Sequence, residues 1–319
     1  MPRFSAKPLL GLAFLAATVL AACSKAPEPT PPPADVATPA PAAEAPPAPA
    51  QEHVHTFKIG ELSSVALWDG GMEVPNDNKV FDLGGTPEEV AAVLGAAGLP
   101  TDKLALTIHP LLVKTADRVL LFDTGAGPLF GPGSGHLLVS FAEAGIDPQS
   151  VTDIFISHSH GDHVGGLVNA EGKLNFPNAK IHLSKPEWEF MSGQDQYKKW
   201  IPVIKDKVDT FKPGAELVPG VVKAVEIKGH TPGHSGYRIT SGSETLLYVG
   251  DSMHHSVISV QKPDWTIAFD GDSATATASR VALIAQLATS GERIYAVHFP
   301  FPGIGKIEKR GDEAVWVAE

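Results

Sequence analysis

One short stretch restricts this chain to folds that gather metal ligands at the end of a strand. Four metal-binding side chains fall within six consecutive residues: His158, His160, Asp162 and His163. Residues 151–156 are apolar and mostly β-branched, which predicts a buried strand ending at this cluster. In α/β folds, functional sites lie at the carboxyl ends of strands. Imidazole and carboxylate groups without thiolate suit zinc, manganese, iron or cobalt rather than calcium.

Three further candidate ligands each follow another apolar run: His230, Asp251 and His298. The strands predicted before them cover residues 221–227, 245–249 and 293–297. Alone, each ligand is typical of a strand cap or of a core residue with satisfied hydrogen bonds. Four strand ends that carry histidine and aspartate together predict one site at one rim. Seven ligands suit two metal ions.

Turn and capping signals predict the elements between these strands. Thr86, Pro87 and Glu89 form a capping box with proline at the first helical position, so we expect a helix that stops at Gly98. We also expect strands at 57–59 and 64–68 closed by a turn at 69–71, a hairpin of 104–113 and 118–122, strands at 180–183 and 237–240, and helices near 136–144, 186–191 and 273–288. This order is compatible with two sheets packed face to face under helices.

The motifs, in this order, resemble the metallo-β-lactamase superfamily over residues 53–310. His-x-His-x-Asp-His comes first, then Gly-His-Thr-Pro-Gly-His, Gly-Asp and a last histidine. The resemblance implies an α/β (α+β) fold, the αββα sandwich, with two mixed sheets packed face to face and helices outside. It also implies that one metal ion is held by His158, His160 and His230, and a second by Asp162, His163 and His298. Asp251 would bridge both ions, with zinc as the first choice and manganese, iron or cobalt as alternatives.

Within that superfamily, three stretches resemble the methyl parathion hydrolase group. They are residues 122–132, 176–179 and 301–305, the last with the sequence Phe-Pro-Gly-Ile-Gly. That group hydrolyses phosphotriesters, with esters and lactones as related substrates.

The same resemblance suggests which residues surround the substrate. Phe130 takes the place of a pocket aromatic, and Trp188 or Met191 is the candidate for another wall; ordinary core packing is the alternative for all three. His254 stands where many family lactonases have a tyrosine, and we expect it at the pocket mouth with His255.

The ligand set predicts a hydrolytic mechanism. Two divalent cations would share a bridging hydroxide with a pKa of ~7 and would polarise a C=O or P=O group. Asp162 is the candidate catalytic residue, because it would orient this hydroxide, while Asp123 and His234 would hold ligand imidazoles in place or act as structural caps. We therefore expect a dinuclear metal hydrolase of esters, lactones or phosphotriesters. An iron-dependent oxidoreductase on the same fold and a non-catalytic metal-binding lipoprotein are the alternatives.

The first 52 residues predict export and attachment to a membrane. Residues 1–22 carry two basic residues and then an apolar core, which is typical of a secretory signal peptide. Leu-Ala-Ala-Cys at 20–23 resembles the lipobox of bacterial lipoproteins, which implies lipidation of Cys23 and, with Ser24 next, an outer-membrane lipoprotein facing the periplasm. A soluble exported protein with an incidental cysteine is the alternative.

The chain then divides into a tether and a domain. Residues 23–52 are mostly Pro and Ala and predict an extended tether, or else a docking site for a partner. Residues 53–319 are long enough for the hydrolase domain.

Charge narrows the range of partners. The chain has 36 acidic and 25 basic residues and a net charge of −11. Nucleic-acid binding calls for a basic face, so this balance argues against it. We expect a small-molecule substrate and a membrane bound through the N-terminal lipid, and a homodimer is the candidate oligomeric state.

Overall fold

The computed structural model describes residues 52–319, which belong to one compact unit, Ala50–Glu319. The predicted signal peptide, Cys23 and nearly all of the tether lie outside the described residues. Within the described part, no helix is both long and apolar enough to cross a bilayer.

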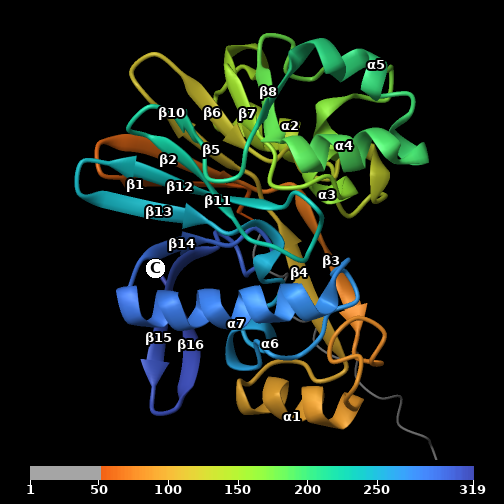
Figure 1. Ribbon diagram of the computed structural model, residues 1–319, viewed down its shortest axis with the longest axis vertical. Coiled ribbons are helices and arrows are strands. Elements are labelled where there is room, and N and C mark those ends of the chain that lie inside the picture. Colours follow the sequence, from red (N-terminus) through yellow and green to blue (C-terminus); the bar gives the residue numbers. More distant parts are fainter. Residues whose placement is uncertain (1–51) are drawn as a thin grey trace, which may run out of the picture. The chain divides into compact units, whose positions relative to one another are not determined.

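Two seven-stranded sheets and their covering helices make up the domain (Figure 1). The first sheet has the order β1 (Val54–Ile59), β2 (Leu62–Leu67), β5 (Leu111–Lys114), β6 (Val119–Phe122), β7 (Asp153–Phe155), β8 (Lys180–Ser184) and β9 (Val208–Phe211). The second has the order β10 (Glu216–Val218), β11 (Val222–Glu226), β12 (Ser235–Ser241), β13 (Glu244–Tyr248), β14 (Arg293–Tyr295), β15 (Ile304–Arg310) and β16 (Glu313–Ala318). A separate pair is formed by β3 (Gly70–Pro75) and β4 (Lys103–Ile108).

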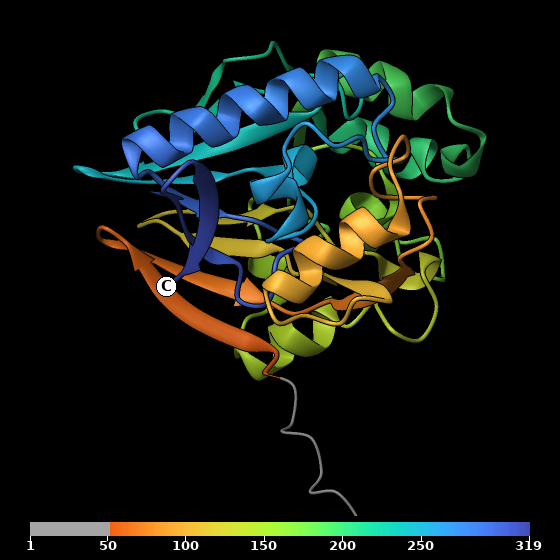
Figure 2. The ribbon, with the colours of Figure 1, turned by 90° about the horizontal axis from the view of Figure 1, so that it is seen from below.

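The α-helices of the described residues lie on the outer faces of the two sheets, beside the β3–β4 pair or at the edge that carries the ligands. They are α1 (Pro87–Ala96), α2 (Leu137–Glu143), α3 (Gly161–Val164), α4 (Lys185–Gly193), α5 (Ile201–Ile204), α6 (Ile258–Gln261) and α7 (Ser273–Ser290). Helices α2, α4 and α5 pack on the first sheet, and α7 packs on the second (Figures 1 and 2). The predicted αββα sandwich is therefore confirmed.

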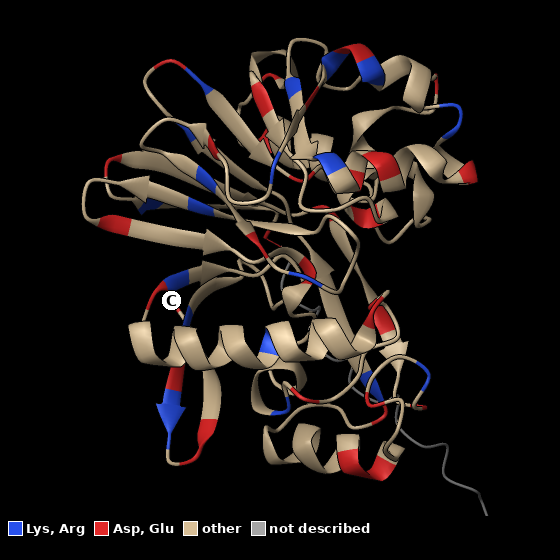
Figure 3. Cartoon of the chain, in the orientation of Figure 1, with Lys and Arg blue, Asp and Glu red and all other residues tan. Residues whose placement is uncertain are grey.

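Alternating side chains explain these layers. In β6, Phe122 packs between the sheets, while its neighbour Leu121 packs under the helices of the first sheet. In β13, Tyr248 packs between the sheets, while Leu247 packs under α7. Since successive strand residues point to opposite faces, each inner strand supplies two apolar layers. In Figure 3 many charged residues lie in loops and near the ends of strands, and α7 carries few of them.

Strand direction brings several carboxyl ends to one edge of each sheet. In the first sheet, β6, β7 and β8 pair in parallel. In the second sheet, β13 and β14 pair in parallel, and β11 runs in the same direction as β13 because both are antiparallel to β12. The residues that follow these strands therefore gather at common edges.

Most of the predicted elements are confirmed, including the capping box of α1, where Glu89 N–H donates to Thr86 Oγ1 and Thr86 N–H donates to Glu89 Oε2. The prediction of one strand over 104–113 is wrong. The chain leaves β4 at His109 and enters another sheet after Pro110, which has no N–H with which to continue a ladder. Strands β3, β9, β10, β15 and β16 were not predicted. The turn predicted at 69–71 is wrong, because Gly70 and Gly71 are the first residues of β3.

Asp69 lies two residues after the end of β2 and anchors the loop of residues 124–137. Its fully buried carboxylate accepts hydrogen bonds from the backbone N–H groups of Ala126 (2.9 Å), Gly135 (3.2 Å) and Leu137 (3.0 Å). Burial raises the pKa of Asp69, and these three N–H groups oppose that effect. Gly125 is required here, because a Cβ would lie 2.4 Å from the Asp69 carboxyl carbon.

We predict that Asp69→Asn lowers the free energy of unfolding by about 1–3 kcal/mol, because an amide NH₂ would face a buried N–H donor. Urea denaturation measures the change. Asp117→Asn is the control, since Asp117 is exposed and its replacement is expected to cost less than about 0.5 kcal/mol. Equal stability of the two variants would contradict the anchoring role of Asp69.

Candidate metal centre

The strand ends of both sheets deliver the ligands to one place. Residues 158–163 follow β7, with Asp162 and His163 on the short helix α3. From the second sheet, His230 follows β11, Asp251 follows β13 and His298 follows β14. The structure thus brings together all seven ligands that the sequence predicts.

These side chains form two adjoining groups. The first contains His158, His160, His230 and Asp251, and the second contains Asp162, His163 and His298; in each group the ligand atoms lie within 4.8 Å of one another. Asp251 Oδ2 faces the first group, 3.4 Å from His230 Nε2. Asp251 Oδ1 faces the second group, 3.2 Å from His163 Nε2 and 3.1 Å from His298 Nε2. One carboxylate therefore presents one oxygen to each group.

The donor atoms fit divalent cations. His230 Nε2 lies 3.1 Å from His158 Nε2 and 3.0 Å from His160 Nδ1, so three imidazole nitrogens converge without an oxygen between them. Within the described residues, His163 Nε2 and Asp251 Oδ1 are buried without a hydrogen-bond partner. Buried polar atoms seldom lack partners, and imidazole with carboxylate is the ligand set of zinc and its first-row neighbours.

Surrounding groups hold the imidazoles in place. Asp123 Oδ2 lies 2.7 Å from His163 Nδ1 and also accepts hydrogen bonds from the hydroxyls of Ser157 and Tyr248. Asp123 adopts the left-handed backbone conformation (φ 58°), which is uncommon for a residue other than glycine. A carboxylate behind a ligand histidine fixes its ring orientation, which is the arrangement expected for Asp123.

The other predicted orienting residue, His234, works differently. Its Nε2 accepts the backbone N–H of Asp251 (2.9 Å), and its Nδ1 lies 3.0 Å from the carbonyl oxygen of Ile227. Burial lowers the pKa of His234 to about 3, so the ring is neutral and can accept that N–H. His234 therefore fixes the backbone of Asp251 rather than a ligand imidazole.

Two other orienting contacts were not predicted. Asp270 Oδ1 lies 3.0 Å from His230 Nδ1, and its other oxygen pairs with the buried Arg280 (3.2 Å). The carbonyl oxygen of Thr107 in β4 lies 2.6 Å from His298 Nδ1. No sequence motif marks Asp270 or Thr107, because each is brought to its histidine only by the folding of the chain.

The pKa values of the ligand side chains depend on burial and on the charges of neighbouring ligands. Burial would lower the pKa of His163, but the neighbouring carboxylates, Asp251 first, raise it well above its usual range. Asp251 and Asp270 likewise outweigh burial and raise the pKa of His230 to about 9. Burial would raise the pKa of Asp251, yet the imidazoles around it hold that pKa well below its usual value. Asp251 is therefore ionised, and metal binding at these histidines displaces protons.

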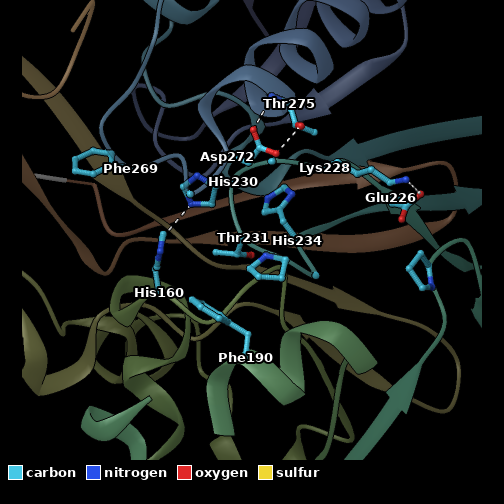
Figure 4. Close-up of a pocket in the computed structure, with 15 residues that line it drawn as sticks. His160, Phe190, Glu226, Lys228, His230, Thr231, His234, Phe269, Asp272 and Thr275 are labelled. Atoms are coloured by element: carbon cyan, nitrogen blue, oxygen red, sulfur yellow. Dashed lines mark hydrogen bonds and ion pairs between the residues drawn. The ribbon is translucent and has the colours of Figure 1, made fainter. Parts of the chain in front are cut away.

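Two adjoining cavities open onto the cluster. One of about 340 Å³ contains ligand side chains and is walled by Met72, Leu106, Phe130, Ala268 and Phe269. The other, of about 590 Å³, includes Phe190 and Lys228 and lies beside His230 (Figure 4). Both are lined by His160 and Phe269, so the ligand group lies where they meet.

The predicted pocket residues fall in different places. Phe130 lines the smaller cavity and is 46% exposed. His254 lines it too, but as a buried side chain whose Nε2 is 3.2 Å from Asp251 Oδ2, so it belongs to the cavity floor rather than the mouth.

Three other pocket predictions are wrong. Trp188 and Met191 pack in the core beneath α4, and Phe190 between them is the residue that lines a cavity, because neighbouring helix positions point in different directions. His255 is buried against Phe81.

The chain is similar to known metallo-hydrolases, which agrees with the metal ligands found at this site. Residues 105–298 match the family model described as the metallo-beta-lactamase superfamily. A probable metallo-hydrolase of Mycobacterium tuberculosis is 27% identical over 188 residues, which cover 48% of this chain and 58% of the relative. An N-acyl homoserine lactonase of Bacillus sp. is 27% identical over 177 residues, covering 49% of this chain and 67% of the relative. The alignment thus spans little more than half of the mycobacterial relative.

Solved structures extend the similarity over most of the domain. AidC, described as a dizinc quorum-quenching lactonase in complex with a product, is 32% identical, with a TM-score of 0.77 over 83% of this chain and 97% of the other. The hydrolase AbOPH of the beta-lactamase superfamily is 26% identical, with a TM-score of 0.75 over 84% of this chain and 97% of the other.

The shared position of Asp251 generates a prediction about metal content. Asp251→Ala removes an oxygen from each group, so we expect ions to be lost from both. His298→Ala is the matched comparison and is expected to deplete the second group alone. Elemental analysis of each purified variant measures ions per chain, and circular dichroism checks that each is folded. Undiminished metal content in Asp251→Ala would contradict the shared arrangement.

Proposed function

Because the chain belongs to the metallo-β-lactamase superfamily, we propose that it is a hydrolase that holds two divalent metal ions, zinc first, and opens lactones. Related esters and phosphotriesters are further substrates of the proposed enzyme. The observation that carries this proposal is the position of Asp251, with one carboxylate oxygen toward each ligand group. The similarity to AidC, at 32% identity, and to N-acyl homoserine lactonases supports lactones as the first substrate class.

The ligand groups define what the metal ions would contribute. His158, His160 and His230 would hold one ion, Asp162, His163 and His298 the other, and Asp251 would contact both. Divalent cations in such a site supply Lewis acidity, which polarises the C=O or P=O bond and activates water at neutral pH.

The protein's own side chains supply positioning and proton handling. Asp162 lines the smaller cavity, where its carboxylate would orient the attacking water by accepting its hydrogen bond. His254 lies on the same cavity floor, where its Nε2 is 3.2 Å from Asp251 Oδ2 and its Nδ1 has no hydrogen-bond partner in the described part of the chain. A neutral imidazole there would donate one hydrogen bond to a substrate oxygen, the role that a tyrosine has in related lactonases.

The apolar wall would bind the part of the substrate that does not react. Phe130 and Phe269 face the cavity that contains the ligands, together with Met72 and Leu106. Burial of an acyl or aryl group against these side chains would exclude bulk solvent from the cavity and hold the reacting bond near Asp162 and its bound water.

We further propose that the enzyme belongs to the methyl parathion hydrolase-like branch and is exported and anchored through Cys23. The 301–305 motif supports the first part, and the 20–23 lipobox supports the second. Metabolic labelling of the full chain with a fatty acid, with Cys23→Ser as control, tests the anchor.

We expect hydrolysis to depend on metal. The purified full chain should contain two ions per chain and hydrolyse N-hexanoyl-homoserine lactone faster than a 4-nitrophenyl ester or a phosphotriester. A chelator should abolish all three activities, and added zinc should restore them. Elemental analysis and product release provide the measurements. Iron with oxygen consumption and no hydrolysis would favour the oxidoreductase, and absence of bound metal would favour a non-catalytic lipoprotein.

Phe130→Ala is expected to change substrate preference and leave metal content unchanged. Loss of half-exposed aromatic contact area corresponds to about 1 kcal/mol, or roughly fivefold in kcat/KM for long acyl chains, with less effect on short ones. Leu138→Ala is the matched control, because Leu138 is similarly exposed but lies outside the ligand-bearing cavities. An equal loss for all chain lengths would show that Phe130 does not contact the acyl chain.

A further inference from the structure

A buried acidic residue, Glu187, connects two loops of the metal centre. It lies in the first turn of α4, where Ser184 is the N-cap, and its side chain is completely buried. One carboxylate oxygen, Oε1, accepts the N–H (2.8 Å) and the hydroxyl (2.6 Å) of Ser159. The other, Oε2, accepts the hydroxyl of Thr231 (2.7 Å) and the N–H of Gly233 (2.9 Å). All four donors are neutral groups.

These partners are neighbours of the ligands in sequence. Ser159 stands between His158 and His160, and Thr231 directly follows His230. Glu187 therefore joins, through one carboxylate, the segments that carry all three histidines of the first ligand group. Thr231 and His230 share one short loop in Figure 4, next to Phe190 of α4.

The local packing leaves little freedom around this contact. Gly233 lies so close to α4 that a Cβ there would be 2.2 Å from the Glu187 nitrogen and 2.3 Å from Ser184 Oγ. Ser184 donates its hydroxyl hydrogen to the Gly233 carbonyl (2.7 Å), and the Tyr197 hydroxyl donates to the Ser159 carbonyl (2.6 Å). The first turn of α4 therefore packs tightly against the ligand loops that contain Ser159 and Gly233.

We propose that Glu187 is a positioning residue for the metal ion of the first group, setting the separation of its two ligand loops. This inference rests on the proposed function, since it requires that His158, His160 and His230 hold an ion. The hydrogen bonds of Glu187 keep the three nitrogens convergent before an ion arrives. Its buried negative charge also favours a cation in the adjoining site.

The buried carboxylate of Asp153 has contacts of a different kind. Asp153 begins β7, at the opposite end of the strand from the ligands, and accepts hydrogen bonds from Thr152 (2.8 Å) and Arg118 (3.2 Å). Its side chain is as buried as those of the site, but none of its hydrogen-bond partners adjoins a ligand in sequence. Asp153 therefore provides a matched control for loss of a buried carboxylate.

The test is Glu187→Gln in the full chain, with zinc and cobalt affinities measured by competition with a chromogenic chelator. Glutamine keeps the size but replaces one acceptor oxygen with an NH₂ group, which faces a backbone N–H that cannot accept. We expect affinity at one of the two sites to fall by about 10- to 100-fold, the other site to stay unchanged, and excess zinc to restore hydrolysis. Asp153→Asn should lower thermal stability and leave both affinities unchanged.

Thr231→Val provides a milder variant that removes a single hydrogen bond and keeps the side-chain volume. We expect a weakening of the same site by several-fold, so the proposal remains testable if Glu187→Gln does not fold. Unchanged affinity at both sites in a folded Glu187→Gln or in Thr231→Val would overturn the positioning role. Failure of the unsubstituted chain to bind metal would instead overturn the proposed function, so the two failures are distinguishable.

Discussion

The rest of the site depends on how the buried negative charge of Asp251 is compensated. Six other ligand side chains surround this buried carboxylate, with one oxygen directed to each ligand group. A buried charge is stable only if opposite charge or hydrogen bonds compensate it. The surrounding imidazoles do this when they carry protons, and metal ions would do it in their place. The backbone N–H of Asp251 is in turn held by the neutral ring of His234, so the carboxylate has one fixed position.

The fold supplies this convergence through strand direction. Since β7 in one sheet and β11, β13 and β14 in the other end near each other, their following loops meet without long excursions. The apolar layers between and outside the sheets fix the strand positions, and the polar contacts of Asp123, Asp270 and Glu187 fix the loops that extend from them. Apolar packing thus fixes where the strands end, and buried carboxylates fix the conformation of the ligand loops.

The ligand residues and the strands that carry them were predictable from sequence, because the 158–163 cluster and each later ligand directly follow a local apolar run. The supporting residues were not. Glu187 reaches Ser159 across 28 positions of the chain and Asp270 reaches His230 across 40, and no local signal marks such contacts. The prediction of the pocket wall was wrong for a related reason. Trp188 and Phe190 are two positions apart on one helix, and only the packing of α4 decides which of them faces the cavity. Strand β15 carries four charged residues among its seven and so lacks the apolar run of an inner strand. Strand β16 does contain an apolar run, residues 314–318, but this run lies beyond the chain's last motif.

The way Asp69 holds the 124–137 loop affects how this enzyme could diversify. That carboxylate grips the loop through backbone N–H groups alone, which every residue type except proline provides. Side chains such as Phe130 are therefore free to be exchanged during evolution, while the path of the loop and the histidines behind it stay the same. The architecture therefore separates the residues that hold the ligand loops from side chains that line the cavity, so the cavity wall can be altered without moving the ligands.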